Sequence, residues 1–195
     1  MSRPDLEGVA TRAVEAALSA GADDAEAWVE EAVTRQIRVY EGGVESLTDA
    51  GSRGLGIRTF LDGRSGYAYG TDMGDEAVRT LAGQARAIAE VADVDEHGGL
   101  PDELGAAEVA GLHAAGLADW STERKIELAV EIEKVARSHA GISQVEDTVY
   151  SDVEGSVALA NSRGFRSSYE ASSVWAYASA FAGEGADLMT GLGVA

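Results

Sequence analysis

The chain contains no cysteine, only two prolines, and fewer than half as many basic as acidic residues, 15 against 34. The lack of cysteine excludes disulfides, thiolate metal ligands and cysteine nucleophiles. The shortage of basic residues leaves a net charge of −19. Binding to DNA or anionic lipid relies on Lys and Arg side chains that neutralise phosphate, so this charge opposes it. The sequence therefore predicts no nucleic acid and no membrane among the partners.

Long apolar segments are also missing, because no run of 18 apolar residues occurs that could span a membrane. The first residues, "MSRPDLEGVATRAVEAAL", contain acidic side chains where a secretory signal needs an uninterrupted apolar stretch. We therefore expect a cytoplasmic protein. Hydrophobic residues make up 45% of the 195 residues, which is enough to build a buried core.

Motifs for catalysis are equally scarce. The three histidines, His97, His113 and His139, are too far apart to share a helix face, and none is followed by a glutamate. A catalytic zinc normally needs three protein ligands, and no such set is visible in the sequence. No serine lies in a G-x-S-x-G motif. We therefore assign no catalytic, cofactor-binding or metal-binding residue, and no cofactor, to this chain.

The glycine-rich stretch "GSRGLGIRTFLDGRSGYAYG", residues 51–70, is the segment that suggests nucleotide binding. Its G-x-x-G-x-G order is not that of a dinucleotide loop, and no Gly-Lys-Ser/Thr follows it. It also leads into a strand-like run, whereas phosphate-binding loops open a helix. Glycines in strands more often mark bulges or a close backbone approach. We interpret the stretch as strands joined by a type I′ turn at Asp62-Gly63.

Apolar residues recur at helical spacing in three segments. The first covers 5–20, includes Leu18 and ends at Gly21; the second covers 75–92, includes Ile88 and takes Asp72 as its N-cap. The third opens at Ser121, ends at Gly141 and pairs Glu133 with Arg137 at i,i+4 spacing. Its predicted inner face consists of Leu128, Ala129, Ile132, Val135 and Ala136.

The remaining apolar residues alternate with polar ones, which predicts strands. In the first half these strands are "AEAWVEEAV", "QIRVY", "VESLT", "LGIRTFL" and "RSGYAYG". In the second half they are "SQVEDTVYSD", "GSVALANS" and "FRSSYEASSVWAYASAFAG". Short turns favour hairpins over a parallel doubly wound sheet. The predicted fold class is α+β, in two small halves, each a helix plus antiparallel strands.

The two halves are separated by an acidic segment. Residues 93–120 hold seven Asp or Glu, five glycines and one proline, but no Lys or Arg. Such a composition is typical of a linker or a long surface connection. We expect an N-terminal domain at 1–92, this connection at 93–120, and a second domain at 121–195.

The succession of segments resembles the TldD/PmbA family, whose members are named as modulators of DNA gyrase and as peptide-maturing metallopeptidases. The N-terminal part of the resemblance rests on "ALSAGADDAEAWVEE", "IRVYEGGVESLTDAGSRGLGIRTFLDGRSGYAYGTD" and "DEAVRTLAGQARAIAEVA". The central part rests on "YSDVEGSVALANSRGFRSSYEASSVWAYASAFAGEGADLMTG", which includes the Asn-Ser-Arg-Gly turn. Details are closer to the PmbA (TldE) type.

The resemblance implies a cytoplasmic protease system that acts on peptides or unfolded segments. In the family, the TldD-type subunit carries zinc on an H-E-x-x-x-H motif in its C-terminal portion, and the TldE-type subunit pairs with it. This sequence stops at "GLGVA" and contains no His-Glu dipeptide, so no family catalytic residue can be placed on it. We expect a truncated, non-catalytic chain that self-associates or joins a TldD-type catalytic subunit.

The sequence is also compatible with two alternative functions. The chain could be a stand-alone protein-binding module that regulates a partner without a peptidase role. It could also act directly on gyrase or DNA, as the family's older name suggests, although its acidic charge weighs against DNA contact.

Overall fold

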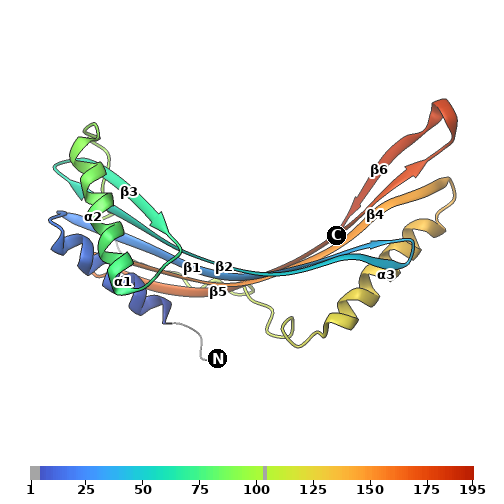
Figure 1. The fold of residues 1–195 in the computed structure, drawn as a ribbon, viewed down its shortest axis with the longest axis horizontal. Helices are drawn as coiled ribbons and strands as arrows, with labels where there is room; N and C mark the ends of the chain where they lie inside the picture. Colours follow the sequence, from blue (N-terminus) through green and yellow to red (C-terminus); the bar gives the residue numbers. More distant parts are fainter. Residues whose placement is uncertain (1–4, 103–104) are drawn as a thin grey trace. The chain divides into compact units, whose positions relative to one another are not determined.

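The computed structural model describes residues 5–102 and 105–195. Within them lie α1 (Leu6–Ser19), β1 (Asp24–Tyr40), β2 (Gly43–Leu61), β3 (Arg64–Gly70), α2 (Asp75–Val91), α3 (Thr122–Ser138), β4 (Ile142–Asn161), β5 (Arg166–Ala182), a 3₁₀ turn (Gly185–Asp187) and β6 (Met189–Val194). The strands form one sheet in the order β3-β2-β1-β4-β5-β6 (Figure 1). The predicted α+β fold class is confirmed.

The chain divides into two compact units. Unit 1 combines Met1–Ala32, Ser52–Ala110 and Gly155–Glu170, and unit 2 combines Val33–Gly51, Gly111–Glu154 and Ala171–Ala195. Each unit therefore collects segments that are distant in the sequence. Strands β1, β2, β4 and β5 contribute residues to both units, since each continues past a unit boundary.

Unit 1 has its core where α1 and α2 cover the sheet. The two helices lie side by side, and α2 packs against β3 (Figure 1). The core residues of α1 include Val9, Ala13 and Ala17, which share one face as the helical spacing predicts. Asp5 caps α1 by accepting a hydrogen bond of 2.8 Å from the backbone N–H of Gly8. Gly21 ends the helix with φ +95°, as the sequence predicts.

Unit 2 is built around α3, which lies on β1 and β4. Its small apolar core joins Ala129 of α3 to Ile37 and Val39 of β1 and to Tyr150 of β4. Ser121 caps α3, with its hydroxyl accepting from the backbone N–H of Arg124, so the predicted start of this helix is confirmed.

The strands are longer than the sequence predicts. The segments "AEAWVEEAV" and "QIRVY" belong to one 17-residue strand, β1, and "VESLT" and "LGIRTFL" belong to the 19-residue β2. The segments "SQVEDTVYSD" and "GSVALANS" form the 20-residue β4. Glycines and charged residues interrupt the alternating pattern in these segments, but each strand continues through them. The predicted turn at Asp62-Gly63 is confirmed, because both residues have positive φ, 50° and 72°.

Several predicted positions on the helices are wrong. Leu18 and Ile88 are 39% and 47% exposed, since each lies at the margin of its apolar stripe. Gly74, not Asp72, is the N-cap of α2; the Asp72 carboxylate instead accepts from the Gly74 N–H at 2.9 Å. Helix α3 ends at Ser138, with His139 as its C-cap, before Gly141.

The predicted inner face of α3 is the largest error. Of the five apolar residues expected there, only Ala129 is buried; Leu128 and Val135 are exposed. The buried side chains are Lys125, Ala129 and Glu133, which follow one another at four-residue spacing. Two of these three buried side chains are charged. The spacing of apolar residues alone therefore predicts the wrong buried face of α3. The expected pair of Glu133 and Arg137 is confirmed at 2.8 Å.

Candidate functional site

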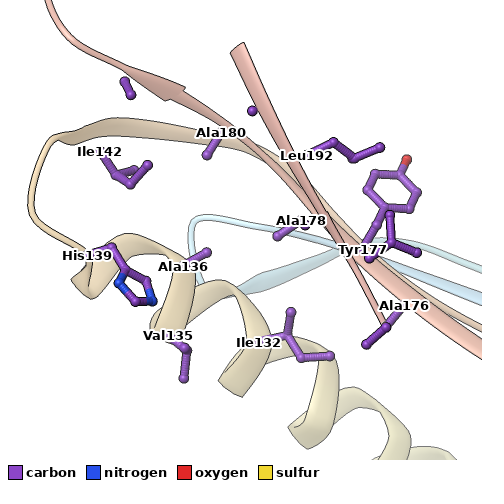
Figure 2. Close-up of a pocket in the computed structure, with 15 residues that line it drawn as sticks. Ile132, Val135, Ala136, His139, Ile142, Ala176, Tyr177, Ala178, Ala180 and Leu192 are labelled. Carbon is purple, nitrogen blue, oxygen red and sulfur yellow. The ribbon is translucent and has the colours of Figure 1, made fainter. Parts of the chain in front are cut away.

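An apolar groove of about 510 Å³ is the most distinctive surface of unit 2. Helix α3 supplies Ile132, Val135 and Ala136 along one side, as Figure 2 shows. Small side chains of β5 form its floor, and Leu192 and Val194 of β6 complete the lining. This floor is formed by Ala176, Ala178, Ala180 and Ala182, whose short side chains leave space for the groove. The groove suits an apolar partner, because few polar groups line it.

Tyr177, one of the two polar side chains that line this groove, has a structural partner. The hydroxyl of Tyr177 donates a hydrogen bond of 3.0 Å to the Asp147 carboxylate, and Arg38 binds the same carboxylate at 3.2 Å. Partial burial, followed by the bond to Asp147, raises the pKa of Tyr177. Tyr177 therefore remains protonated at neutral pH. His139 lies at the end of α3 beside Ile142 (Figure 2).

A group of buried polar side chains lies between α3 and β4, with Lys125 on the helix and Tyr150 and Asp152 on the strand. The Lys125 ammonium is 2.7 Å from the Asp152 carboxylate, and both side chains are almost completely buried. Burial, followed by the neighbouring Asp152 carboxylate, raises the pKa of Tyr150 on the same strand. An ion pair and a protonated phenol in a low-dielectric setting are common at catalytic sites. Structural ion pairs also produce such shifts, and Lys125, Tyr150 and Asp152 line none of the described grooves.

At the other end of α3, Glu133 binds the turn between β1 and β2. Its carboxylate oxygens accept hydrogen bonds from the backbone N–H groups of Glu41 and Gly42, at 2.8 and 2.7 Å. Both turn residues have positive φ, as in a type I′ turn. Arg137 donates to the same carboxylate. The geometry anchors a hairpin to a helix and leaves no free carboxylate oxygen for chemistry.

In unit 1, the Asn161-Ser162-Arg163-Gly164 turn is also a structural anchor. Arg163 donates to the Asp24 carboxylate at 3.0 Å and to the backbone oxygen of Leu100 at 3.0 Å. The Asn161 side chain accepts from the backbone N–H groups of Arg163 and Phe165. Through Leu100 and Asp102, Arg163 ties the start of the acidic connection to unit 1.

The glycine-rich stretch 51–70 lies within β2, the Asp62-Gly63 turn and β3. Gly66 allows α2 to approach β3, because a Cβ there would lie 2.1 Å from the backbone oxygen of Ala85. Gly56 is covered by Tyr67, whose hydroxyl would lie 2.3 Å from such a Cβ. Gly56 and Gly66 are therefore packing positions, and the stretch opens no helix that could hold phosphate.

An acidic hollow of about 430 Å³ in unit 1 is lined by Asp5, Glu7, Glu31 and Glu170 together with Ser168 and Tyr169. The Ser168 hydroxyl donates to Glu7. Across residues 5–102 and 105–195, no group of three or more His, Asp or Glu side chains is arranged to hold a metal ion. The hollow therefore gives an acidic surface without a metal-binding geometry in the described residues.

The histidines are spread over both units. His97 lies in unit 1, His139 lines the groove of unit 2, and His113 lies 3.5 Å from Glu154 in unit 2. One histidine beside one carboxylate is less than a catalytic zinc needs. Sequence reasoning missed Lys125 altogether and did not predict that Glu133 is buried. Neither residue belongs to a motif, and only their burial on the inner face of α3 distinguishes them.

Two family domains match the sequence. The PmbA/TldA metallopeptidase domain 1 matches residues 25–89, and the PmbA/TldA metallopeptidase central domain matches residues 116–194. No curated protein matches the chain.

Solved structures share the fold over nearly the whole chain. A putative modulator of DNA gyrase from Bacteroides thetaiotaomicron has a TM-score of 0.87 at 20% identity, covering 100% of this chain and 45% of its own. A putative modulator of DNA gyrase from Thermotoga maritima has a TM-score of 0.76 at 18% identity, with coverages of 96% and 42%. TldE from Thermococcus kodakarensis has a TM-score of 0.82 at 18% identity, with coverages of 95% and 42%. The chain thus spans less than half the length of these proteins.

Proposed function

Because the chain belongs to the TldD/PmbA family of metallopeptidases, we propose that it is a non-catalytic part of a peptidase of this type. In this role it contributes to the proteolysis of peptides or unfolded segments by shaping the substrate path or the subunit interface. The observation that carries the proposal is the match to both family domains, in order, over residues 25–89 and 116–194.

A non-catalytic role is supported by the structural hydrogen bonds and ion pairs that the most buried or best-connected polar side chains form. The Glu133 carboxylate accepts a hydrogen bond from the backbone of the β1–β2 turn and forms an ion pair with Arg137. Lys125 forms an ion pair with Asp152, and Arg163 forms one with Asp24. The zinc that the family name implies does not fit the described donor groups, since His113 and Glu154 offer one histidine and one carboxylate. We therefore derive no hydrolytic step from this chain. A second polypeptide would have to supply the zinc and the general base.

A TldD-type catalytic subunit is the partner that this role requires. The similarity to TldE from Thermococcus kodakarensis supports the TldE-type assignment, which remains part of the proposal. The described residues contain no helix long and apolar enough to cross a membrane. The cytoplasmic location that the family resemblance implies is part of the proposal.

The test is a metal analysis and a peptide-cleavage assay of the purified chain, each with and without a TldD-type subunit from the same organism. We expect less than a tenth of a zinc ion per chain after dialysis, no cleavage of an unfolded peptide by the chain alone, and cleavage with the partner. A chelator should abolish that cleavage. One zinc per chain, or chelator-sensitive cleavage by the chain alone, would contradict the proposal.

A stand-alone protein-binding module is the second candidate, and the apolar groove of unit 2 favours it. The two candidates differ in what the bound partner is. Affinity capture from the native cytoplasm should recover a TldD-type subunit under the first proposal. Recovery of an unrelated protein, lost in an Ala178→Glu variant that places a charge on the groove floor, would favour the second.

A further inference from the structure

In unit 1 the sheet has one face covered by helices and one open face. Helices α1 and α2 cover the face that holds the buried residues Ala27, Val29, Ile57 and Ala68. Side chains alternate between the two faces along a strand, so Trp28 of β1 and Tyr67 and Tyr69 of β3 lie on the opposite face. These three aromatic side chains are 41%, 54% and 77% exposed. Exposed apolar side chains that lie together mark an interaction surface.

Trp28 lies beside Gly56 on this open face. Its neighbours on the same face of β1, Glu26 and Glu30, contact the residues two after and two before Gly56 in β2. Trp28 is midway between the two glutamates, and Gly56 is midway between the residues that they contact. The two residues therefore lie next to each other on adjacent strands.

The two tyrosines continue the same row. Tyr69 lies directly opposite Gly56 in the pairing of β2 with β3. The ring of Tyr67 covers Gly56, because its hydroxyl would lie 2.3 Å from a Cβ at that position. The rings of Tyr67 and Tyr69 are stacked, with centroids 6.1 Å apart. Trp28, Tyr67 and Tyr69 thus form a row of three rings across the strands, which we call the aromatic strip.

The same face already holds one cation between a ring and a carboxylate. The guanidinium of Arg58 lies 5.3 Å from the centroid of the Phe60 ring and forms an ion pair with Glu26. Glu30 offers a carboxylate in a similar setting, since it accepts a hydrogen bond of 3.0 Å from the indole N–H of Trp28. No basic side chain in residues 5–102 and 105–195 forms an ion pair with Glu30. Aromatic faces attract cations, and a neighbouring carboxylate adds to that attraction.

We propose that the aromatic strip and Glu30 bind a basic, extended segment of another polypeptide, with its Lys or Arg side chains on the rings. Alternate side chains of an extended segment lie about 7 Å apart, close to the separation of the two tyrosine rings. An open sheet face accepts such a segment along its length. The net charge of −19 favours the approach of a basic partner over an acidic one.

This inference goes beyond the proposed peptidase role and does not depend on it. If both hold, the strip selects basic segments among the peptides that the complex cleaves. The test below measures binding to the chain without a catalytic subunit, so it succeeds or fails independently of the cleavage assay.

The experiment measures the fluorescence anisotropy of a labelled peptide of alternating Lys and Ser residues, titrated with the full chain. We expect saturable binding, and at least tenfold weaker binding of the same peptide with Gln in place of Lys. Tyr69→Ala removes the most exposed ring of the strip and should weaken binding of the Lys peptide at least fivefold. Tyr69→Phe keeps the ring and should bind within twofold of the natural chain.

A pair of charge-matched variants separates the strip from the general acidity of the chain. Glu30→Gln should weaken binding of the Lys peptide at least threefold. Glu76→Gln removes the same charge from an exposed position in the first turn of α2 and should change binding less than twofold. Circular dichroism verifies that each variant folds.

Three results would overturn the proposal. They are the absence of saturable binding of the Lys peptide, unweakened binding by folded Tyr69→Ala, and equal losses in Glu30→Gln and Glu76→Gln. The last result would show that the peptide responds only to the net charge of the protein.

Discussion

The buried carboxylate of Glu133 accepts a hydrogen bond of 2.7 Å from the backbone N–H of Gly42, across 91 positions of the sequence. This contact, repeated at Glu41, fastens the β1–β2 turn to helix α3. The turn needs positive φ at both residues, and the carboxylate satisfies the two N–H groups that the turn directs at the helix. The Glu133 side chain thus holds the β1–β2 turn against helix α3 within unit 2.

Replacing Glu133 with glutamine should destabilise the protein. The amide keeps one acceptor but places a donor NH₂ group against the backbone N–H groups and Arg137, and hydrogen bonds to a charged group are worth about 1.5–3 kcal/mol. We expect a loss of about 2 kcal/mol in urea denaturation. Glu131→Gln is the matched control, because Glu131 is exposed on the same helix and should change stability by less than about 0.5 kcal/mol. Equal effects of the two variants would contradict the anchoring role.

The Lys125–Asp152 pair should show strong coupling in a double-mutant cycle. Removing one partner leaves the other charge buried, which costs about 3–5 kcal/mol. We expect Lys125→Met and Asp152→Asn each to lose this much, and the double variant to lose clearly less than the sum. The exposed pair Lys134–Glu131 serves as the control, since Lys134→Met should cost less than about 1 kcal/mol. Additive losses would show that the buried pair is not coupled.

Two glycine-to-alanine substitutions should have opposite signs. At Gly66 a Cβ would lie 2.1 Å from the Ala85 oxygen of α2, so Gly66→Ala must move the helix and should cost about 2 kcal/mol or more. Gly83, inside α2, has open space around it, and Gly83→Ala should stabilise the helix by about 0.5–1 kcal/mol. Thermal denaturation measures both changes. A tolerated Gly66→Ala would contradict the close approach of α2 to β3.

Tyr150 should make the protein sensitive to high pH. Burial and Asp152 raise its pKa in the folded state above the unfolded value of about 10. Above that pH the unfolded chain releases the phenol proton and the folded chain retains it, so stability falls as pH rises. We expect Tyr150→Phe to lose less stability than the natural chain between pH 9 and 11.5 in urea titrations. Tyr69→Phe, on an exposed side chain, should follow the natural chain.

Direct binding to DNA should be absent. The net charge of −19 opposes the counterion release that drives protein–DNA association. We expect no shift of a mixed-sequence duplex in gel mobility assays at 50–150 mM salt. A shift that weakens steeply with added salt would show a cationic surface on the protein and would contradict this expectation.

Local chemistry made part of the fold predictable from the sequence. Asp62-Gly63 specified its turn because few residue pairs accept positive φ at both positions. Ser121 marked the start of α3, and the i,i+4 spacing of Glu133 and Arg137 brought their side chains together. The sequence also limited the chemistry, since a chain without cysteine and without paired histidines has few ways to hold zinc.

The tertiary structure decided which polar residues are buried. Lys125 and Glu133 lie on the inner face of α3 because Asp152 and the Glu41-Gly42 turn, both distant in sequence, supply their partners. Apolar periodicity assumes that a buried face is apolar, and it fails where a charge is paired on burial. The length of the strands could not be predicted from the sequence for a related reason. Gly54 and Gly56 interrupt the alternation of apolar and polar residues in β2, but side chains from β1 and β3 cover these two glycines. In each case a residue distant in the sequence decides whether a side chain is buried or a strand continues. The local composition does not indicate which distant residue will be the partner.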